Sequence, residues 1–73
     1  MKTYKTRIHN ALYDDGLCFE IKYAAITADT KAEAMRMAAK AVDKFMRCVV
    51  EQTVDAGPDA IKGVQWLIGH EKL

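Results

Sequence analysis

The chain of 73 residues is long enough for one domain, and its hydrophobic share of 51% favours a folded globule over disorder. Eleven basic and ten acidic residues leave a formal net charge of +1, which excludes a bulk attraction to nucleic acid or to an anionic membrane. There is no apolar run of about 18 residues and no apolar leader, so we expect neither a membrane span nor a signal peptide. Two cysteines, Cys18 and Cys48, are too few for a disulfide scaffold, and a reduced, cytoplasmic protein is expected.

Residues 3–12 and 17–27 each alternate with a period of two, as in strands with one polar face, and predict a β-hairpin. Asp15-Gly16 between them suits a two-residue type I′ turn. That loop places Ile8 opposite Tyr23, so that the side chains on each face of the hairpin are consistent in polarity. The inward side chains are then Tyr4, Thr6, Ile8, Asn10 and Leu12 of the first strand and Leu17, Phe19, Ile21, Tyr23 and Ala25 of the second. A three-residue loop would pair Ile8 with Lys22 and mix the faces, so we expect the two-residue loop.

Residues 30–56 have the pattern of one long amphipathic helix. Thr30 and Glu33 form a capping box, and Gly57 followed by Pro58 supplies a stop signal. At about 100° per residue, the apolar side chains fall into one stripe. The stripe consists of Met35, Ala38, Val42, Phe45, Met46, Val49 and Thr53.

The last third of this segment also fits a strand. Residues 48–54 are rich in β-branched side chains, so the alternative is a helix that ends near Arg47 and a further strand before Gly57. The continuous helix is favoured because no Gly or Pro interrupts it and the polar side continues through Glu51 and Asp55.

A final strand is predicted over residues 63–70, after a turn at Gly57-Pro58-Asp59; a short helix from Pro58 is the alternative. The predicted fold is a single α+β domain over residues 1–73, a two-layer sandwich of one helix on an antiparallel sheet. The order is ββαβ with three strands, or ββαββ with four. The long apolar stripe would overhang so short a sheet, and a homodimer is one way to cover it.

Few residues suggest catalysis or metal binding. His9 and His70 are the only histidines, and no Cys-x-x-Cys, His-x-x-x-His or carboxylate cluster accompanies them. Cys18 does not face His9 in the predicted hairpin, so a nucleophile activated by histidine is not expected. The aspartates cluster in turns, where they serve local hydrogen bonding. We therefore expect no enzyme activity, no metal and no cofactor.

A basic strand face is the main candidate binding site. In the predicted register Lys5, Arg7, His9 and Lys22 gather on the outer face of the hairpin, which suits phosphates or an acidic protein surface. The aromatic side chains of a stacking platform are missing from it, because they point inward. Leu67 adds an exposed apolar contact if Trp66 is buried. The alternative is an ordinary solvated sheet face.

The stretch Ile26–Ala34, with its T-A-x-T-x-x-E-A pattern, leads into a helix that also contains Ala38 and Ala41. A hairpin followed by such a helix resembles small phage and mobile-element proteins, including anti-CRISPR inhibitors with a strand–strand–helix–strand layout. The resemblance implies a stoichiometric inhibitor that binds a host protein or ribonucleoprotein complex. A nucleic-acid-binding module that uses the basic face is the alternative.

Overall fold

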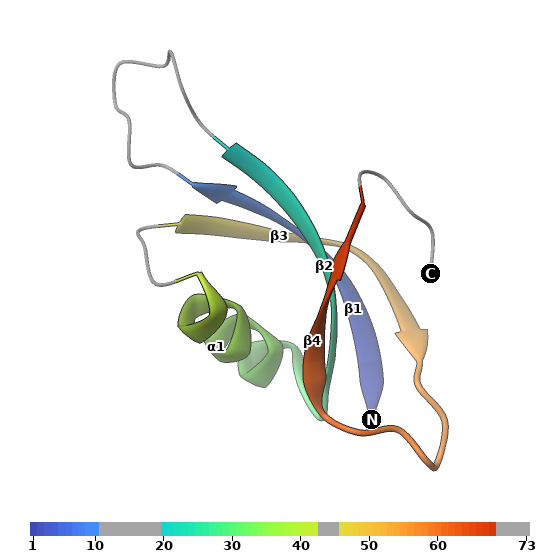
Figure 1. Cartoon of the computed structure of the whole chain (residues 1–73). Helices are drawn as coiled ribbons and strands as arrows, with labels where there is room; N and C mark the ends of the chain where they lie inside the picture. The colour runs from blue at the N-terminus through green and yellow to red at the C-terminus, as the bar shows by residue number, and fades with distance from the viewer. Residues whose placement is uncertain (11–19, 43–45, 69–73) are drawn as a thin grey trace.

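A four-stranded sheet and one helix make up the described chain. The structure is a computed structural model that describes residues 1–10, 20–42 and 46–68. Figure 1 shows the elements in chain order. They are β1 (Lys2–Asn10), β2 (Glu20–Ala28), α1 (Lys31–Ala41), β3 (Met46–Asp55) and β4 (Gly63–Leu67).

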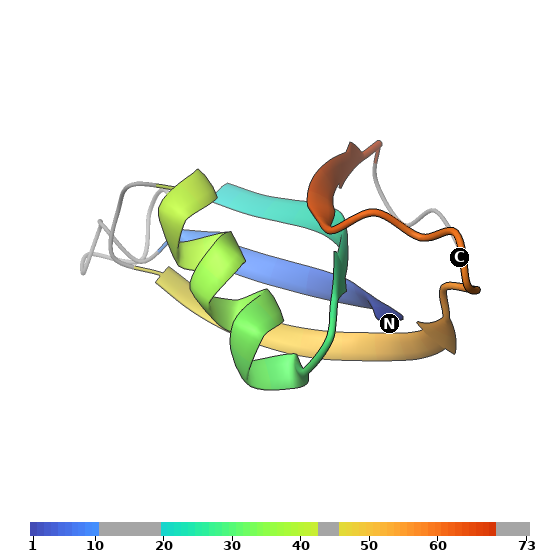
Figure 2. The same ribbon diagram turned by 90° about the horizontal axis from the view of Figure 1, so that it is seen from below.

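The strands are ordered β3-β1-β2-β4, and every neighbouring pair is antiparallel. The helix α1 lies across one side of this sheet (Figure 2). The α+β class is therefore confirmed, in the four-stranded ββαββ order. No helix among the described residues is both long and apolar enough to cross a membrane.

The predicted hairpin register is wrong by one residue. Ile8 lies opposite Lys22, and Arg7 lies opposite Tyr23. Even-numbered residues of both strands consequently face α1, and Ile21 and Tyr23 turn to the opposite side. The hairpin loop itself lies outside the described residues.

The alanines of α1 give a physical reason for this register. The buried side chains of the helix are Ala34 and Ala38, both fully buried. Alanine side chains let a helix approach a sheet closely, so small side chains are favoured beneath them. Ala24 and Ala28 provide those small side chains and are also fully buried. With Tyr4, Ile8 and Ile26 they complete the core.

The long helix is the second incorrect prediction, because α1 ends at Ala41. Val42 is its C-cap, and its N–H donates to Ala38 O at 3.2 Å. The segment Met46–Asp55 is strand β3, so the strand alternative is the right one. As a strand, this segment pairs with the second edge of β1. Cys48 lies opposite Ile8, Val50 lies opposite Thr6, and both pack against the core. Phe45 lies outside the described residues.

The predicted start of the helix is confirmed. Thr30 is the N-cap, and its Oγ1 accepts from Glu33 N at 3.1 Å. Glu33 Oε1 accepts in turn from Asp29 N at 3.1 Å, one residue earlier than in a standard capping box. This contact fixes the link between β2 and α1.

The connection from β3 to β4 contains the predicted turn. Gly57 has φ of 87°, and Ala60 N donates to Gly57 O at 3.4 Å. Pro58 and Asp59 form a turn, so the alternative of a short helix from Pro58 is wrong. The overhanging helix that motivated a homodimer does not exist, because α1 has 11 residues.

Candidate binding face

The sheet has a second face, which points away from α1. Lys5, Arg7 and His9 lie on it from β1, opposite Ala25, Tyr23 and Ile21 of β2. Leu67 of β4 joins them through its pairing with Tyr23. We call this surface the outer face and define it by Lys5, Arg7, His9, Ile21, Tyr23 and Leu67.

Lys22 does not belong to the outer face, contrary to the sequence prediction. It shares the α1 side of the sheet with Ile8, because a shift of one residue moves every side chain of a strand to the other face. Its ammonium group lies 5.5 Å from the centre of the Trp66 ring. Trp66 is 45% exposed, so the condition under which Leu67 was expected to be exposed, a buried Trp66, does not hold; Leu67 is half-buried.

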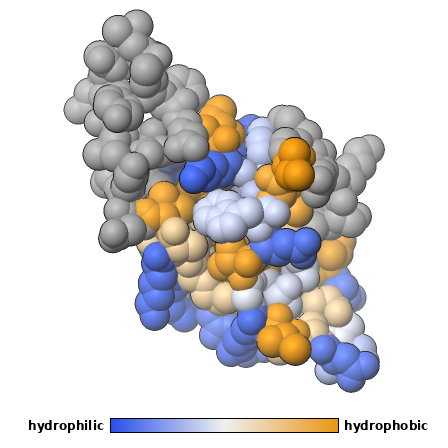
Figure 3. All heavy atoms as spheres, in the orientation of Figure 1, coloured by the Kyte–Doolittle hydropathy of each residue, from blue (hydrophilic) through white to orange (hydrophobic). Residues whose placement is uncertain are grey.

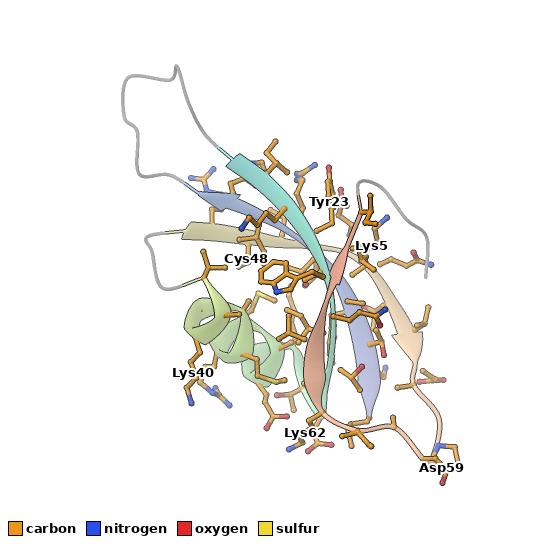
Figure 4. All side chains as sticks on the ribbon, in the orientation of Figure 1. Lys5, Tyr23, Lys40, Cys48, Asp59 and Lys62 are labelled. Carbon is orange, nitrogen blue, oxygen red and sulfur yellow. The ribbon has the colours of Figure 1, made fainter. Side chains whose placement is uncertain are left out.

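Lys5 is buried although it carries a charge. Its residue is only 6% exposed, and its ammonium group lies 5.8 Å from the centre of the Tyr23 ring. Figure 4 shows the two side chains near one another, on the side of the sheet away from α1. An aromatic ring attracts a cation through the negative charge of its face. The Lys5 ammonium group therefore interacts with the Tyr23 ring and offers little charge to solvent.

Arg7 is held by an acidic partner from the neighbouring strand. Its Nη1 lies 3.3 Å from Glu51 Oε2, and the two side chains are 35% and 26% exposed. The register of β3 shifts at this point, since Lys5 pairs with Gln52 and Thr6 with Val50. A bulge of this kind redirects a side chain, and here it leaves Glu51 close to Arg7. Arg7 Nε is buried without an acceptor among the described residues.

Exposed apolar side chains surround these charges. Ile21 is 42% exposed, and Val49, which lies opposite Arg7 on β3, is 36% exposed. A shallow, open depression of about 360 Å³ lies between β2 and β4. It is lined by Ile21, Lys22, Tyr23, Trp66 and Leu67. Figure 3 has β4 in front, as in Figure 1, and on that side hydrophobic and hydrophilic groups are mixed instead of forming one apolar patch.

The remaining candidates for chemistry lie away from this face. Cys48 faces the α1 side, as Figure 4 shows, and burial raises the pKa of its thiol. A raised pKa lowers the fraction of reactive thiolate at neutral pH. Among the described residues, no group of three His, Cys, Asp or Glu side chains could hold a metal ion. Cys18 and His70 lie outside the described part of the chain.

The arrangement is thus suited to binding. The structure brings together four of the five residues predicted as a site, namely Lys5, Arg7, His9 and Leu67, and separates Lys22 from them. Sequence reasoning missed Tyr23 and Ile21 as members of this face. The signal that could have found them is Ala24 and Ala28, which match the alanines of α1 in size.

Comparisons with protein-family models, with curated proteins and with solved structures found no match to the chain.

Proposed function

We propose that the chain is a non-catalytic binding protein that engages a protein partner through its outer face. The observation that carries this proposal is the placement of Tyr23 beside Arg7, with Ile21 and Val49 exposed around them. Tyrosine and arginine are enriched among residues that dominate protein interfaces. The exposed apolar side chains supply surface that gains from burial.

The charges indicate the chemistry of the partner. Lys5, Arg7 and His9 lie on the outer face, and the exposed Arg47 of β3 continues the row opposite His9. Because Lys5 and Arg7 are already engaged by Tyr23 and Glu51, Arg47 is the cation expected to meet a partner's carboxylate. Glu51 is a carboxylate close to them. A partner that combines carboxylates with an apolar patch would complement this surface.

A finer version of the proposal comes from the resemblance to anti-CRISPR proteins. The chain would then be a stoichiometric inhibitor of a host protein or ribonucleoprotein complex, and the same face would be the contact. The small number of cysteines supports a reducing compartment such as the cytoplasm for this activity.

The experiment uses two isoleucines as a matched pair. Ile21→Glu places a carboxylate on the outer face, and Ile61→Glu makes the same change at a residue that is 84% exposed on the β3–β4 connection. Wild-type protein and both variants are immobilised, partners are captured from host extract, and purified partners are titrated by calorimetry. We expect Ile21→Glu to abolish binding and Ile61→Glu to keep it. Equal binding by both variants would refute the outer face as the site.

Nucleic-acid binding is the second candidate, and one observation favours it. Tyr23 shares the outer face with basic residues, and stacking of bases requires an aromatic side chain among such residues. Two of the cations are engaged within the chain, Lys5 with Tyr23 and Arg7 with Glu51, which leaves fewer of them for phosphates. Fluorescence anisotropy with labelled single-stranded DNA and RNA distinguishes the candidates. Binding that weakens steeply with added salt and is lost in Tyr23→Ala would favour nucleic acid.

A further inference from the structure

The two edges of the sheet differ in how well they are protected. Within the described residues, β3 and β4 each have a strand neighbour on one side only. The β3 edge carries Arg47, Glu51 and Asp55 together with a bulge, and charges and bulges both discourage pairing with another strand. The β4 edge has neither.

The β4 edge is uncharged and apolar. Its sequence G-V-Q-W-L contains no charged residue and no proline. Three of the exposed large apolar side chains lie on or beside it, and Figure 2 shows β4, in red, at the margin of the sheet. These are Ile61 at 84%, Trp66 at 45% and Ile68 at 86% exposure. An exposed apolar edge strand invites pairing with another strand, so an edge of this composition needs a cover.

We propose that the cover is a second copy of this chain, which pairs β4 with β4 in antiparallel fashion across a two-fold axis at Gln65. Each residue of β4 then has a partner: Gly63 lies opposite Leu67, and Val64 lies opposite Trp66. The product is a continuous sheet of eight strands, within the size range of natural sheets. The interface is isologous and closed, as in most homodimers.

The side-chain pattern of β4 is complementary to itself in this register. Val64 and Trp66 lie on the α1 side, where Val64 contacts the core. The indole of Trp66 would cover Val64 of the second copy, and aromatic–aliphatic pairs of this kind stabilise antiparallel strands. Gln65 would lie opposite itself on the axis. An amide side chain both donates and accepts hydrogen bonds, so two glutamines satisfy one another.

This inference goes beyond the proposed function and is tested separately from it. Leu67 of β4 belongs to both surfaces, whereas Arg7, Ile21 and Tyr23, which carry the proposed function, lie on β1 and β2. Ile21→Glu should therefore leave the dimer intact. If the chain does not dimerise, the role of the outer face is still tested by Ile21→Glu and Ile61→Glu.

The first test is the mass in solution. Sedimentation equilibrium of the full chain over the micromolar range should give twice the chain mass of 8.2 kDa. Trp66 is the only tryptophan, so its emission should move to shorter wavelengths as the concentration rises and the indole loses water. A monomer throughout the range would overturn the proposal.

Charge at the axis provides the second test. Gln65 is exposed, so Gln65→Lys and Gln65→Glu should keep the fold. Each puts like charges opposite one another and should raise the dimer Kd by up to roughly fivefold. A mixture of the two variants places Lys opposite Glu and should form a heterodimer.

Gln52→Lys on the β3 edge is the matched control and should dimerise like wild type. Loss of the dimer in Gln52→Lys, with no effect at Gln65, would assign it to the other edge and contradict the proposal.

A disulfide trap fixes the register. In a Cys18→Ser, Cys48→Ser background, Gln65→Cys places two thiols opposite one another on the axis, and mild oxidation should cross-link it rapidly. Gln52→Cys is the matched control and should cross-link slowly. Equal rates would show that the disulfide reports collision alone and would overturn the register.

Discussion

The ammonium group of Lys62 lies 2.8 Å from Asp29 Oδ2 and 3.1 Å from Glu33 Oε2, and it joins the β3–β4 connection to the start of α1. Figure 4 shows Lys62 near the foot of β4. The hydrogen bond from Lys62 lowers the pKa of Asp29. The pKa of Glu33 is lowered first by the N–H of Asp29 and then by Lys62, and the same two carboxylates raise the pKa of Lys62.

Stability should fall at both ends of the pH range because of this cluster. Carboxyl groups with a lowered pKa stabilise the fold above their ordinary values, 3.8 for Asp29 and 4.5 for Glu33, and this stabilisation is lost as pH falls through the folded values. Lys62, with a raised pKa, stabilises the fold below its ordinary 10.5, and that contribution is lost as pH rises through the folded value. Lys62→Met should weaken both dependences, measured as Tm by circular dichroism against pH.

Arg47→Met is the control for this measurement. Arg47 is exposed and lies opposite His9, at the other end of β1 from the pair Lys2–Ala28 beside Asp29, so its replacement should leave the pH dependence of Tm unchanged. An unchanged acid-side loss in Lys62→Met would show that other carboxylates cause it.

Neighbouring alanines on α1 test the close approach of helix and sheet. Ala38 is fully buried against the core, whereas Ala39 is exposed. Ala38→Leu should destabilise the protein by about 1–3 kcal/mol, because the added atoms have no space. Ala39→Leu should change stability by less than about 0.5 kcal/mol. Urea unfolding of both variants measures the difference, and equal stabilities would mean that the helix can move away from the sheet without loss.

The same alanines explain which parts of the fold could be predicted. The element types of β1, β2 and β4 and the start of α1 follow from local patterns, namely alternation in the strands and the Thr30–Glu33 cap at the start of the helix. The register of the hairpin does not, because it depends on the contact of Ala24 and Ala28 with a helix later in the chain. A register chosen so that each face of the hairpin is consistent in polarity is therefore wrong.

The end of α1 was ambiguous for a related reason. Residues 48–54 carry both a helical polar stripe and β-branched side chains. Tertiary contact decides between them, because β3 supplies partners for the whole of β1 and covers Ile8 with Cys48. In the candidate site, Lys5, Arg7 and His9 were predictable from alternation in β1 alone, whereas Lys22 and Tyr23 depended on the register.

Two glycines test the turn before β4. Gly57 has φ of 87°, a conformation that L-residues rarely adopt, and a Cβ there would meet no atom within 4 Å. Gly57→Ala should cost about 1 kcal/mol through backbone strain alone. A Cβ at Gly63 also meets nothing within 4 Å, and no positive φ is required there. Gly63→Ala should be neutral or stabilising by up to about 1 kcal/mol. Thermal melts compare the two, and a neutral Gly57→Ala would mean that the turn can change its conformation.

Lys5 tests whether the outer face works by charge or by shape. Its side chain is buried and its ammonium group lies 5.8 Å from the Tyr23 ring centre. Lys5→Met keeps an unbranched chain of similar length and removes the charge, so stability should change by no more than about 1 kcal/mol. Lys5→Glu places a carboxylate against the negative face of the ring and should cost about 1–3 kcal/mol. Urea unfolding measures both.

The partner affinity of the same variants then separates the two modes of binding. If Lys5 acts only by holding the Tyr23 ring in place, Lys5→Met should weaken partner binding by less than about tenfold, or 1.4 kcal/mol. Ile21→Glu should abolish binding, because Ile21 is 42% exposed on the proposed contact surface. A larger loss for Lys5→Met than for Ile21→Glu, with an unchanged Tm, would mean that the Lys5 ammonium group reaches the partner. The outer face would then bind chiefly through charge, and its affinity should fall as salt is added.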